Sequence, residues 1–195
     1  MTEDSADPAP ADRAGRRDAL AEAVAELVLR EGLGTMGLRG LARRLGTSDR
    51  MLIYYFGSKD ALVTGVLARI GEKLSVLLQA YSAGPPVSPG AFLGQVLALG
   101  RDPVVMPFMR VWTDVIARAA AGEAPYDTVA KAVVADWTAW IGTRLVPDPD
   151  RPCPPAALLS IVEGVTLLEM ACPGSTAAAG PWLAEALTRA GGPSA

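Results

Sequence analysis

The sequence predicts an all-α protein, and two observations predict it: the amino-acid composition and the spacing of the apolar residues. Half of the 195 residues are hydrophobic, and most of these are Ala, Leu and Val. Ala and Leu favour helices, whereas β-branched residues never gather in the alternating runs that favour strands. Apolar residues instead recur three and four positions apart, in segments separated by Pro and Gly. We therefore expect a helical protein with a sizeable core and no β-sheet.

The N-terminal segment, residues 1–15, is predicted to be a disordered leader. It opens with an acidic stretch from Met1 to Asp12 that contains Pro8 and Pro10. This stretch does not have the pattern of a signal peptide. No run in the chain reaches the roughly 18 uncharged apolar residues that a membrane-spanning helix needs. We therefore expect a cytoplasmic protein without a membrane partner.

Residues 16–60 are predicted to form a small domain of three helices. The first carries an apolar stripe and ends at Gly32, and the second spans 38–45. The third begins at Ser48, whose hydroxyl can cap a helix N-terminus, and it ends before Gly57. The second and third helices are thus short and are joined by a tight turn, which is the pattern of a helix-turn-helix.

The turn residues Gly46-Thr47-Ser48 and the local charge both fit a DNA-facing module. Gly at the end of a helix permits the left-handed backbone conformation that a tight turn needs. The next helix can then present its first residues to a DNA major groove, which admits one helix. Between Gly32 and Lys59 there are 5 basic residues and 1 acid, whereas from Tyr81 onward there are 7 basic and 10 acidic residues. A positive region of this kind fits DNA binding, although a solvated helical face explains the charge equally well.

The segment LRGLARRLGTSDRMLIYYFGSKDAL resembles the DNA-binding domain of the tetracycline-repressor (TetR) family. The residues that carry the resemblance are Ala42, Gly46, Ser48, Tyr54, Tyr55, Phe56, Ser58 and Lys59. The position of this segment in the chain and the total length also agree. The resemblance covers residues 16–75, and it implies a transcriptional regulator that binds a palindromic double-stranded DNA operator as a dimer.

By position, the resemblance implies a set of DNA-binding residues at and around the turn. They are Arg39, Thr47, Ser48, Asp49, Arg50, Met51, Tyr55 and Lys59. Arg39 and Lys59 are expected to bind phosphates, and Arg50 can bind either guanine or a phosphate. Asp49 either accepts a hydrogen bond from cytosine or favours the N-terminus of its own helix. Tyr54 and Phe56 are expected to belong to the core.

Residues 61–195 are predicted to form a second helical domain for ligand binding and dimerisation. A long helix over 59–79 joins it to the first domain, and a Pro/Gly-rich loop follows at 82–89. The remaining helices are expected at 89–99, 104–121, 126–145, 155–172 and 181–190.

The second domain contains enough large apolar side chains to line a pocket. The candidate lining residues are Phe92, Met106, Met109, Trp112, Trp137, Trp140 and Met170. Aromatic and methionine side chains with few charges make an apolar wall, although each of them can equally belong to an ordinary core. The resemblance implies a pocket as well, because members of the TetR family commonly bind hydrophobic or cationic molecules between these helices. The expected partner is a small hydrophobic effector.

The helix over 155–172 is apolar around much of its circumference, so it must be buried on more than one side. Small residues such as Ala157 and Gly164 allow another helix to approach closely. The resemblance implies a homodimer formed by the last two long helices, and we map these onto 126–145 and 155–172.

The absence of histidine argues against an enzyme, because His is the commonest general base and zinc ligand. The sequence also lacks a nucleophile elbow, a phosphate-binding Gly loop and a paired-carboxylate motif, so we expect neither a cofactor nor a metal. Cys153 and Cys172 are either free thiols or a redox-switch pair. A ligand-responsive repressor is the favoured function, and an activator of the same family stays open. Two alternatives stay open, namely a helical ligand-binding protein that does not bind DNA and a thiol redox-sensing regulator.

Overall fold

The computed structural model describes residues 10–81, 84–150 and 152–190, which form nine α-helices and one short 3-10 helix. In chain order they are α1 (Pro10–Glu31), the 3-10 helix η1 (Leu33–Thr35), α2 (Leu38–Arg44), α3 (Asp49–Phe56), α4 (Lys59–Tyr81), α5 (Pro89–Leu99), α6 (Met106–Ala120), α7 (Tyr126–Arg144), α8 (Pro155–Ala171) and α9 (Ala179–Ala190). Within these ranges the only β pairing is an isolated bridge between Val87 and Leu145. The predicted all-α class, with an N-terminal helix-turn-helix domain and a helical C-terminal domain, is confirmed. No helix in the described part of the chain is long and apolar enough to cross a membrane.

The start of α1 corrects the expected extent of the leader. Helix α1 begins at Pro10, so residues 10–15 are helical and do not belong to a disordered segment. Proline suits the first position of a helix, because its φ is already helical and the N–H that it lacks would have no partner there. The remaining residues of the expected leader, 1–9, lie outside the described residues.

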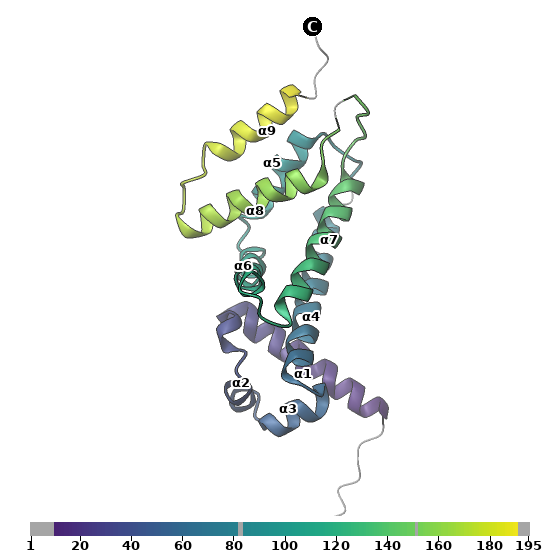
Figure 1. The fold of residues 1–195 in the computed structure, drawn as a ribbon, viewed down its shortest axis with the longest axis vertical. Coiled ribbons are helices and arrows are strands. Elements are labelled where there is room, and N and C mark those ends of the chain that lie inside the picture. The colour runs from purple at the N-terminus through teal and green to yellow at the C-terminus, as the bar shows by residue number, and fades with distance from the viewer. Residues whose placement is uncertain (1–9, 82–83, 151, 191–195) are drawn as a thin grey trace, which may run out of the picture.

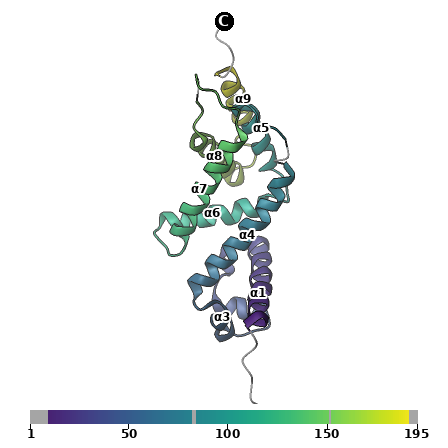
Figure 2. The ribbon, with the colours of Figure 1, turned by 90° about the vertical axis from the view of Figure 1, so that its right-hand side faces the viewer.

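The helices form an elongated molecule (Figure 1). Helices α1, α2 and α3 lie at one end, and α5, α8 and α9 lie at the other. Helix α4 runs from the first end toward the second, and α6 lies across the middle (Figure 2). Helix α4 therefore belongs to the packing of both ends, through its contacts with α1 and α3 and with α7.

Two clusters of buried apolar side chains hold these helices together. The first includes Val28 of α1, Leu52 of α3, Val66 of α4 and Val111 of α6. The second joins α5, α7 and α8. Burying one such side chain contributes roughly 1.5–3 kcal/mol. Since the first cluster runs through α4 into α6 without a break, the helix-turn-helix end and the upper helices do not have wholly separate cores.

Helix α9 closes the far end by crossing α5 at Gly90. A Cβ atom at Gly90 would lie 2.3 Å from the carbonyl oxygen of Ala184, so only glycine permits this close approach. With α9 packed on α5, Trp182 is left 63% exposed on the outer side of α9.

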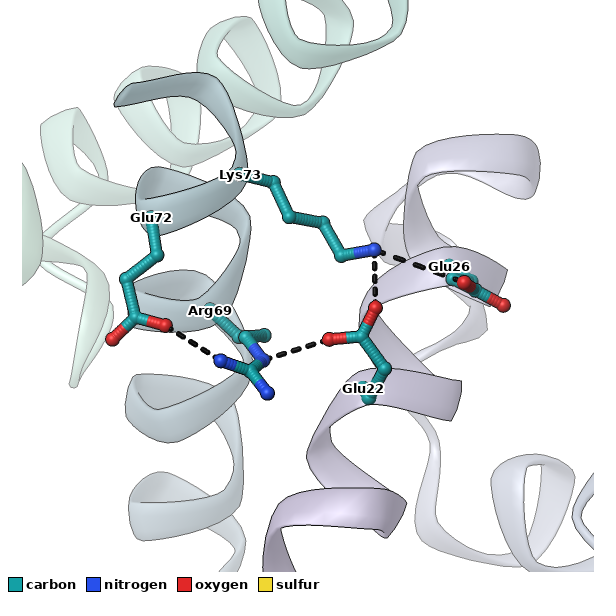
Figure 3. Close-up of polar contacts among 5 residues, drawn as sticks. All are labelled: Glu22, Glu26, Arg69, Glu72 and Lys73. Carbon is teal, nitrogen blue, oxygen red and sulfur yellow. Dashed lines mark hydrogen bonds and ion pairs between the residues drawn. The ribbon is translucent and has the colours of Figure 1, made fainter. Parts of the chain in front are cut away.

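A group of charged side chains joins α1 to α4 (Figure 3). Oε2 of Glu22 in α1 lies 2.7 Å from Nε of Arg69 in α4. The other carboxylate oxygen of Glu22 pairs with Nζ of Lys73, also in α4. Arg69 and Lys73 also reach a second carboxylate each, on Glu72 and Glu26 respectively. The hydrogen bond from Lys73, together with Arg69, holds the pKa of Glu22 below its usual range. A single exposed ion pair contributes little to the free energy of unfolding. A network of several charges can contribute more, because each side chain is held by more than one partner.

Replacing Glu22 with Gln is expected to lower the Tm by roughly 1–3 °C at low salt, because the substitution removes the carboxylate shared by two cations. Glu26→Gln is the matched control. Its carboxylate lies 3.7 Å from Lys73, the one cation in the group that it reaches. Thermal unfolding followed by circular dichroism measures both variants, and equal shifts for the two would contradict a central role for Glu22.

The pH dependence of that difference has a defined sign. Because the folded chain lowers the pKa of Glu22, the stabilisation is present above the ordinary value of 4.5 and is lost as the pH falls through the lowered value. The difference between wild type and Glu22→Gln should therefore shrink in acid, and it should also shrink in about 1 M salt, where charges are screened within roughly 3 Å.

Candidate nucleic-acid interface

The turn between α2 and α3 is closed by backbone hydrogen bonds around Gly46. Gly46 has φ +63°, the left-handed region in which a residue with a Cβ is strained. Thr47 N–H donates to the Ala42 carbonyl at 2.9 Å, and Leu45 N–H donates to the Leu41 carbonyl at 2.9 Å. This is a Schellman-type ending, which satisfies the last carbonyls of α2. The turn therefore fixes the direction in which α3 leaves α2.

The first turn of α3 is capped by its own side chains. Ser48 Oγ accepts the Met51 N–H at 3.1 Å, as expected for an N-cap serine. Asp49 Oδ1 accepts the Arg50 N–H at 3.0 Å. Of the two roles considered for Asp49, this contact favours the local one, in which the carboxylate complements the positive end of the helix.

The sequence-predicted DNA-binding residues lie on α2, on the turn and α3, and at the start of α4. Ser48, Asp49, Arg50 and Met51 are exposed, as are Arg39 and Lys59, whereas Thr47 and Tyr55 are half-buried. None of the ion pairs among the described residues involves Arg39, Arg50 or Lys59. By contrast, Arg44 is paired with Glu31 at the end of α1. The basic side chains near α3 are thus available for an external partner, while Arg44 serves to hold α2 against α1.

The opposite side of α3 anchors the helix in the first core. Leu52 is fully buried and Phe56 is 6% exposed. Tyr54 is only half-buried, and its ring meets that of Tyr55 edge-on with centroids 5.2 Å apart. The expectation that both Tyr54 and Phe56 are core residues therefore holds for Phe56 and only in part for Tyr54. After α3, Ser58 Oγ accepts the Ala61 N–H at 3.0 Å and so caps α4, whose first residue is Lys59.

Comparison with known proteins finds a match for this domain. Residues 20–66 match the family model described as bacterial regulatory proteins, tetR family. The chain has the fold of a TetR-family transcriptional regulator. A solved structure from Rhodococcus sp., assigned to the TetR family of transcriptional regulators, superposes with a TM-score of 0.66 and 22% identity, covering 90% of this chain and 97% of that one. A second solved structure, a transcriptional regulator from Rhodococcus sp. Rha1, superposes with a TM-score of 0.63 and 23% identity. The match covers 89% of this chain and 92% of that one. No curated protein sequence matches the chain.

The body of this TetR-like chain has a groove where α1, α6 and α8 meet. Its volume is about 490 Å³. The end of α1 and the residue after it contribute Val28 to Gly32, and α6 and α8 contribute the rest, including Arg110, Asp114 and Met170. The lining therefore combines apolar side chains with charges of both signs. An occupant of this groove would contact the helix-turn-helix domain and the body at once.

The residues predicted to line an effector pocket do not gather at this groove. Among the seven, Met170 lines it. Phe92 is buried in the second core, where the centroid of its ring lies 5.8 Å from that of the Trp140 ring. The ring centroids of Trp140 and Trp137 are 6.2 Å apart. Met109 is buried in the first core, Trp112 packs against that core, and Met106 is half-buried. The aromatic residues are thus packed mainly against one another and the core, the alternative role that the sequence also allowed.

The half-buried Glu163 of α8 was not anticipated from the sequence. Trp112 Nε1 donates to Glu163 Oε2 at 3.0 Å, across 51 residues of sequence. Burial raises the pKa of Glu163, and the hydrogen bond from Trp112 partly offsets this. No local motif marks such a residue, because its environment is made by α6 packing on α8.

The described residues offer no group of His, Cys, Asp and Glu that could hold a metal ion. Cys153 and Cys172 are free thiols, the second exposed. Burial raises the pKa of Cys153, which disfavours the reactive thiolate that redox sensing needs.

Replacing Glu163 with Gln is expected to raise the Tm at pH 7.5 by roughly 2–4 °C, about 1 kcal/mol for a chain of this size. Glutamine keeps the acceptor for Trp112 but carries no charge to bury. Because burial raises the pKa of Glu163, protonation stabilises the fold. The advantage of Gln should therefore disappear as the pH falls from above the raised value toward 4.5.

Glu169→Gln on the same helix provides a control of opposite sign. Hydrogen bonds from Thr176 and the Gly174 N–H lower the pKa of Glu169, so its substitution should decrease the Tm at neutral pH. Thermal unfolding across pH 4–8 measures both variants. A wild-type Tm above that of Glu163→Gln at pH 7.5 would contradict the assigned cost of the buried charge.

Proposed function

We propose that this protein is a ligand-responsive transcriptional repressor that binds a palindromic operator as a homodimer and is released by a small effector. The observation that carries the proposal is the first turn of α3. It is capped and exposed, and in the sequence it lies between Arg39 of α2 and Lys59 at the start of α4, within the segment that matches the TetR-family model. A helix presented in this way can enter a major groove while basic side chains on either side bind phosphates.

Within this proposal, residues around α3 divide into two roles. Arg50 reads a base edge, since a guanidinium can donate two hydrogen bonds to guanine. Ser48, Met51 and Tyr55 contribute further groove contacts, with Thr47 beside them. Arg39 and Lys59 bind the sugar-phosphate backbone and supply affinity without sequence preference.

Dimerisation is proposed to use the outer faces of α7 and α8. In α8 the exposed face carries Ala157, Ser160, Gly164, Leu167, Leu168 and Ala171. In α7 it carries Ala132, Ala135, Ala139 and Gly142. Small residues let helices pack closely, while Leu168, 57% exposed in the single chain, offers apolar area to bury. Two copies related by a two-fold axis would place their recognition helices about 34–36 Å apart, one turn of DNA.

Release by an effector is proposed to act through α4 and α6. A ligand shifts a conformational equilibrium only by its preference for one state, typically about 1–3 kcal/mol of coupling. The groove between α1, α6 and α8 is one place where a ligand would touch both domains, and its Arg110 and Asp114 suit a molecule with polar as well as hydrophobic parts. Such a molecule would favour a conformation in which the two α3 helices of the dimer no longer fit successive major grooves of the DNA.

The DNA-binding proposal is tested with duplexes selected from a random library by the wild-type protein. On the selected duplex, Arg50→Ala should cost about 1–3 kcal/mol of binding and relax specificity at one position. Lys59→Ala should weaken selected and random duplexes equally and lower the slope of log K against log salt by about 1. Fluorescence anisotropy over a salt series measures both.

Arg189→Ala is the matched control, because it removes the same charge from an exposed position on α9 at the other end of the molecule. It should bind like wild type. If Arg50→Ala and Lys59→Ala also bind like wild type, the proposed docking of α3 is wrong. If the wild-type protein enriches no duplex and shows no salt-dependent binding, the regulator function itself is wrong.

The dimer proposal is tested by charge substitution on α8. Leu168→Glu should raise the dimer dissociation constant by roughly tenfold or more, since it places an unpaired charge in an apolar contact. Val76→Glu is the control, because Val76 is 66% exposed on α4. Size-exclusion chromatography with light scattering measures the mass. Should Trp182→Glu produce monomers while Leu168→Glu stays dimeric, the contact involves α9 and not α8.

A further inference from the structure

The first turns of α1 carry three arginines and lie at the same end of the molecule as α2 and α3 (Figures 1 and 2). Arg13, Arg16 and Arg17 are all exposed. At about 100° per residue, Arg13 and Arg17 lie within about 20° of the direction of Val24, which is buried two to three turns later, whereas Arg16 lies about 80° from it. The apolar stripe that packs α1 onto the first core therefore continues beyond the core as a basic stripe.

Two of these arginines are attached to α3. Arg13 Nη2 donates to the Tyr54 carbonyl at 2.9 Å, and its guanidinium carbon lies 4.4 Å from the centroid of the Tyr54 ring. The Arg17 guanidinium carbon lies 5.6 Å from the centroid of the Phe56 ring. Cations are favourable at this place, because the last carbonyls of a helix carry partial negative charge and aromatic faces attract guanidinium groups. These contacts fix the start of α1 relative to the end of α3.

Arg16 differs from its two neighbours. It makes no hydrogen bond, ion pair or ring contact with another described residue. It lies 60–100° around the helix from Arg13 and Arg17, at about 100° per residue, so the attachment of these two determines where Arg16 points. All three residues precede residues 20–66, the segment that matches the TetR-family domain.

We propose that the start of α1 is a second phosphate-binding element, in which Arg16 contacts the DNA backbone and Arg13 and Arg17 are positioning residues. This inference rests on the proposed DNA-binding function. Lys59 follows α3 directly at the start of α4, so the end of α3 has basic side chains from two different helices beside it. A duplex that holds α3 in its major groove has a phosphate backbone on each side of that groove. The contact by Arg16 therefore adds affinity without adding sequence preference.

The experiment measures anisotropy of the full chain on the selected duplex and on a random duplex over a salt series. Arg16→Ala should weaken both complexes by the same factor, roughly three- to tenfold near 0.1 M salt, and lower the salt slope by about 1. Arg189→Ala is again the matched control, because it removes the same charge from an exposed position on α9 at the other end of the molecule, and it should leave the slope unchanged.

A double-mutant cycle tests the positioning role of Arg13. Arg13→Ala alone should lower the salt slope, but in the Arg16→Ala background it should lower it by much less, because the contact that it positions is already gone. Circular dichroism confirms that each variant is folded.

The possible results separate the two proposals. Wild-type DNA binding with an unchanged slope for Arg16→Ala overturns this inference alone. A selective loss on the selected duplex also overturns it, because that result means base reading and not phosphate binding. Absence of any wild-type binding overturns the proposed function and this inference together.

Discussion

The apolar core that runs from α1 through α4 into α6 is the constraint on which the rest of the structure depends. Val66 and Leu62 of α4 are fully buried in it, and Val111 of α6 belongs to the same cluster as Leu52 of α3. Packed cores resist gradual deformation, since even a small change of volume costs free energy. A shift of α6 or α8 must therefore either be absorbed in the body or carry α4, and with it α3, to a new position. The ion pairs of Glu22 with Arg69 and Lys73 lie on the same α1–α4 contact and support the same coupling.

Backbone geometry decides which side chains this core leaves outside. The left-handed Gly46 and the hydrogen bond from Thr47 to Ala42 set the direction of α3 before any side chain contributes. Once Leu52 and Phe56 are buried, helical periodicity leaves the first turn of α3 facing outward. The carboxylate of Asp49 then accepts a hydrogen bond at the N-terminus of α3, where the positive end of the helix dipole partly offsets its charge. An acid next to a proposed phosphate-binding surface is thus compatible with that role.

Local signals in the sequence were enough to predict the elements but not their assembly. The range 89–99 agrees with α5, because Ser88 caps the helix and Pro89 occupies its first position. The start of α1 was missed, since acidic and Pro-containing sequence also suits a helix N-terminus. The set of pocket residues could not be derived from the sequence. Whether Phe92 faces a ligand or Trp140 depends on how α5 meets α7, and the pairing of Trp112 with Glu163 joins helices far apart in the sequence. The exposed first turn of α3 was predictable, because it follows from local capping and periodicity.

Helix α1 connects the groove between α1, α6 and α8 with the arginines that contact α3. Helix α1 contributes Val28 to Glu31 to the groove at one end, and at the other end its Arg13 and Arg17 contact α3. A helix transmits displacement along its axis because its backbone hydrogen bonds make it stiff over a few turns. A ligand in the groove would therefore act on the end of α1 that faces the body, and the displacement would reach the contacts of Arg13 and Arg17 with α3. In this arrangement α1 and α4 both connect the body to α3, so the orientation of α3 depends on both helices and not on α4 alone.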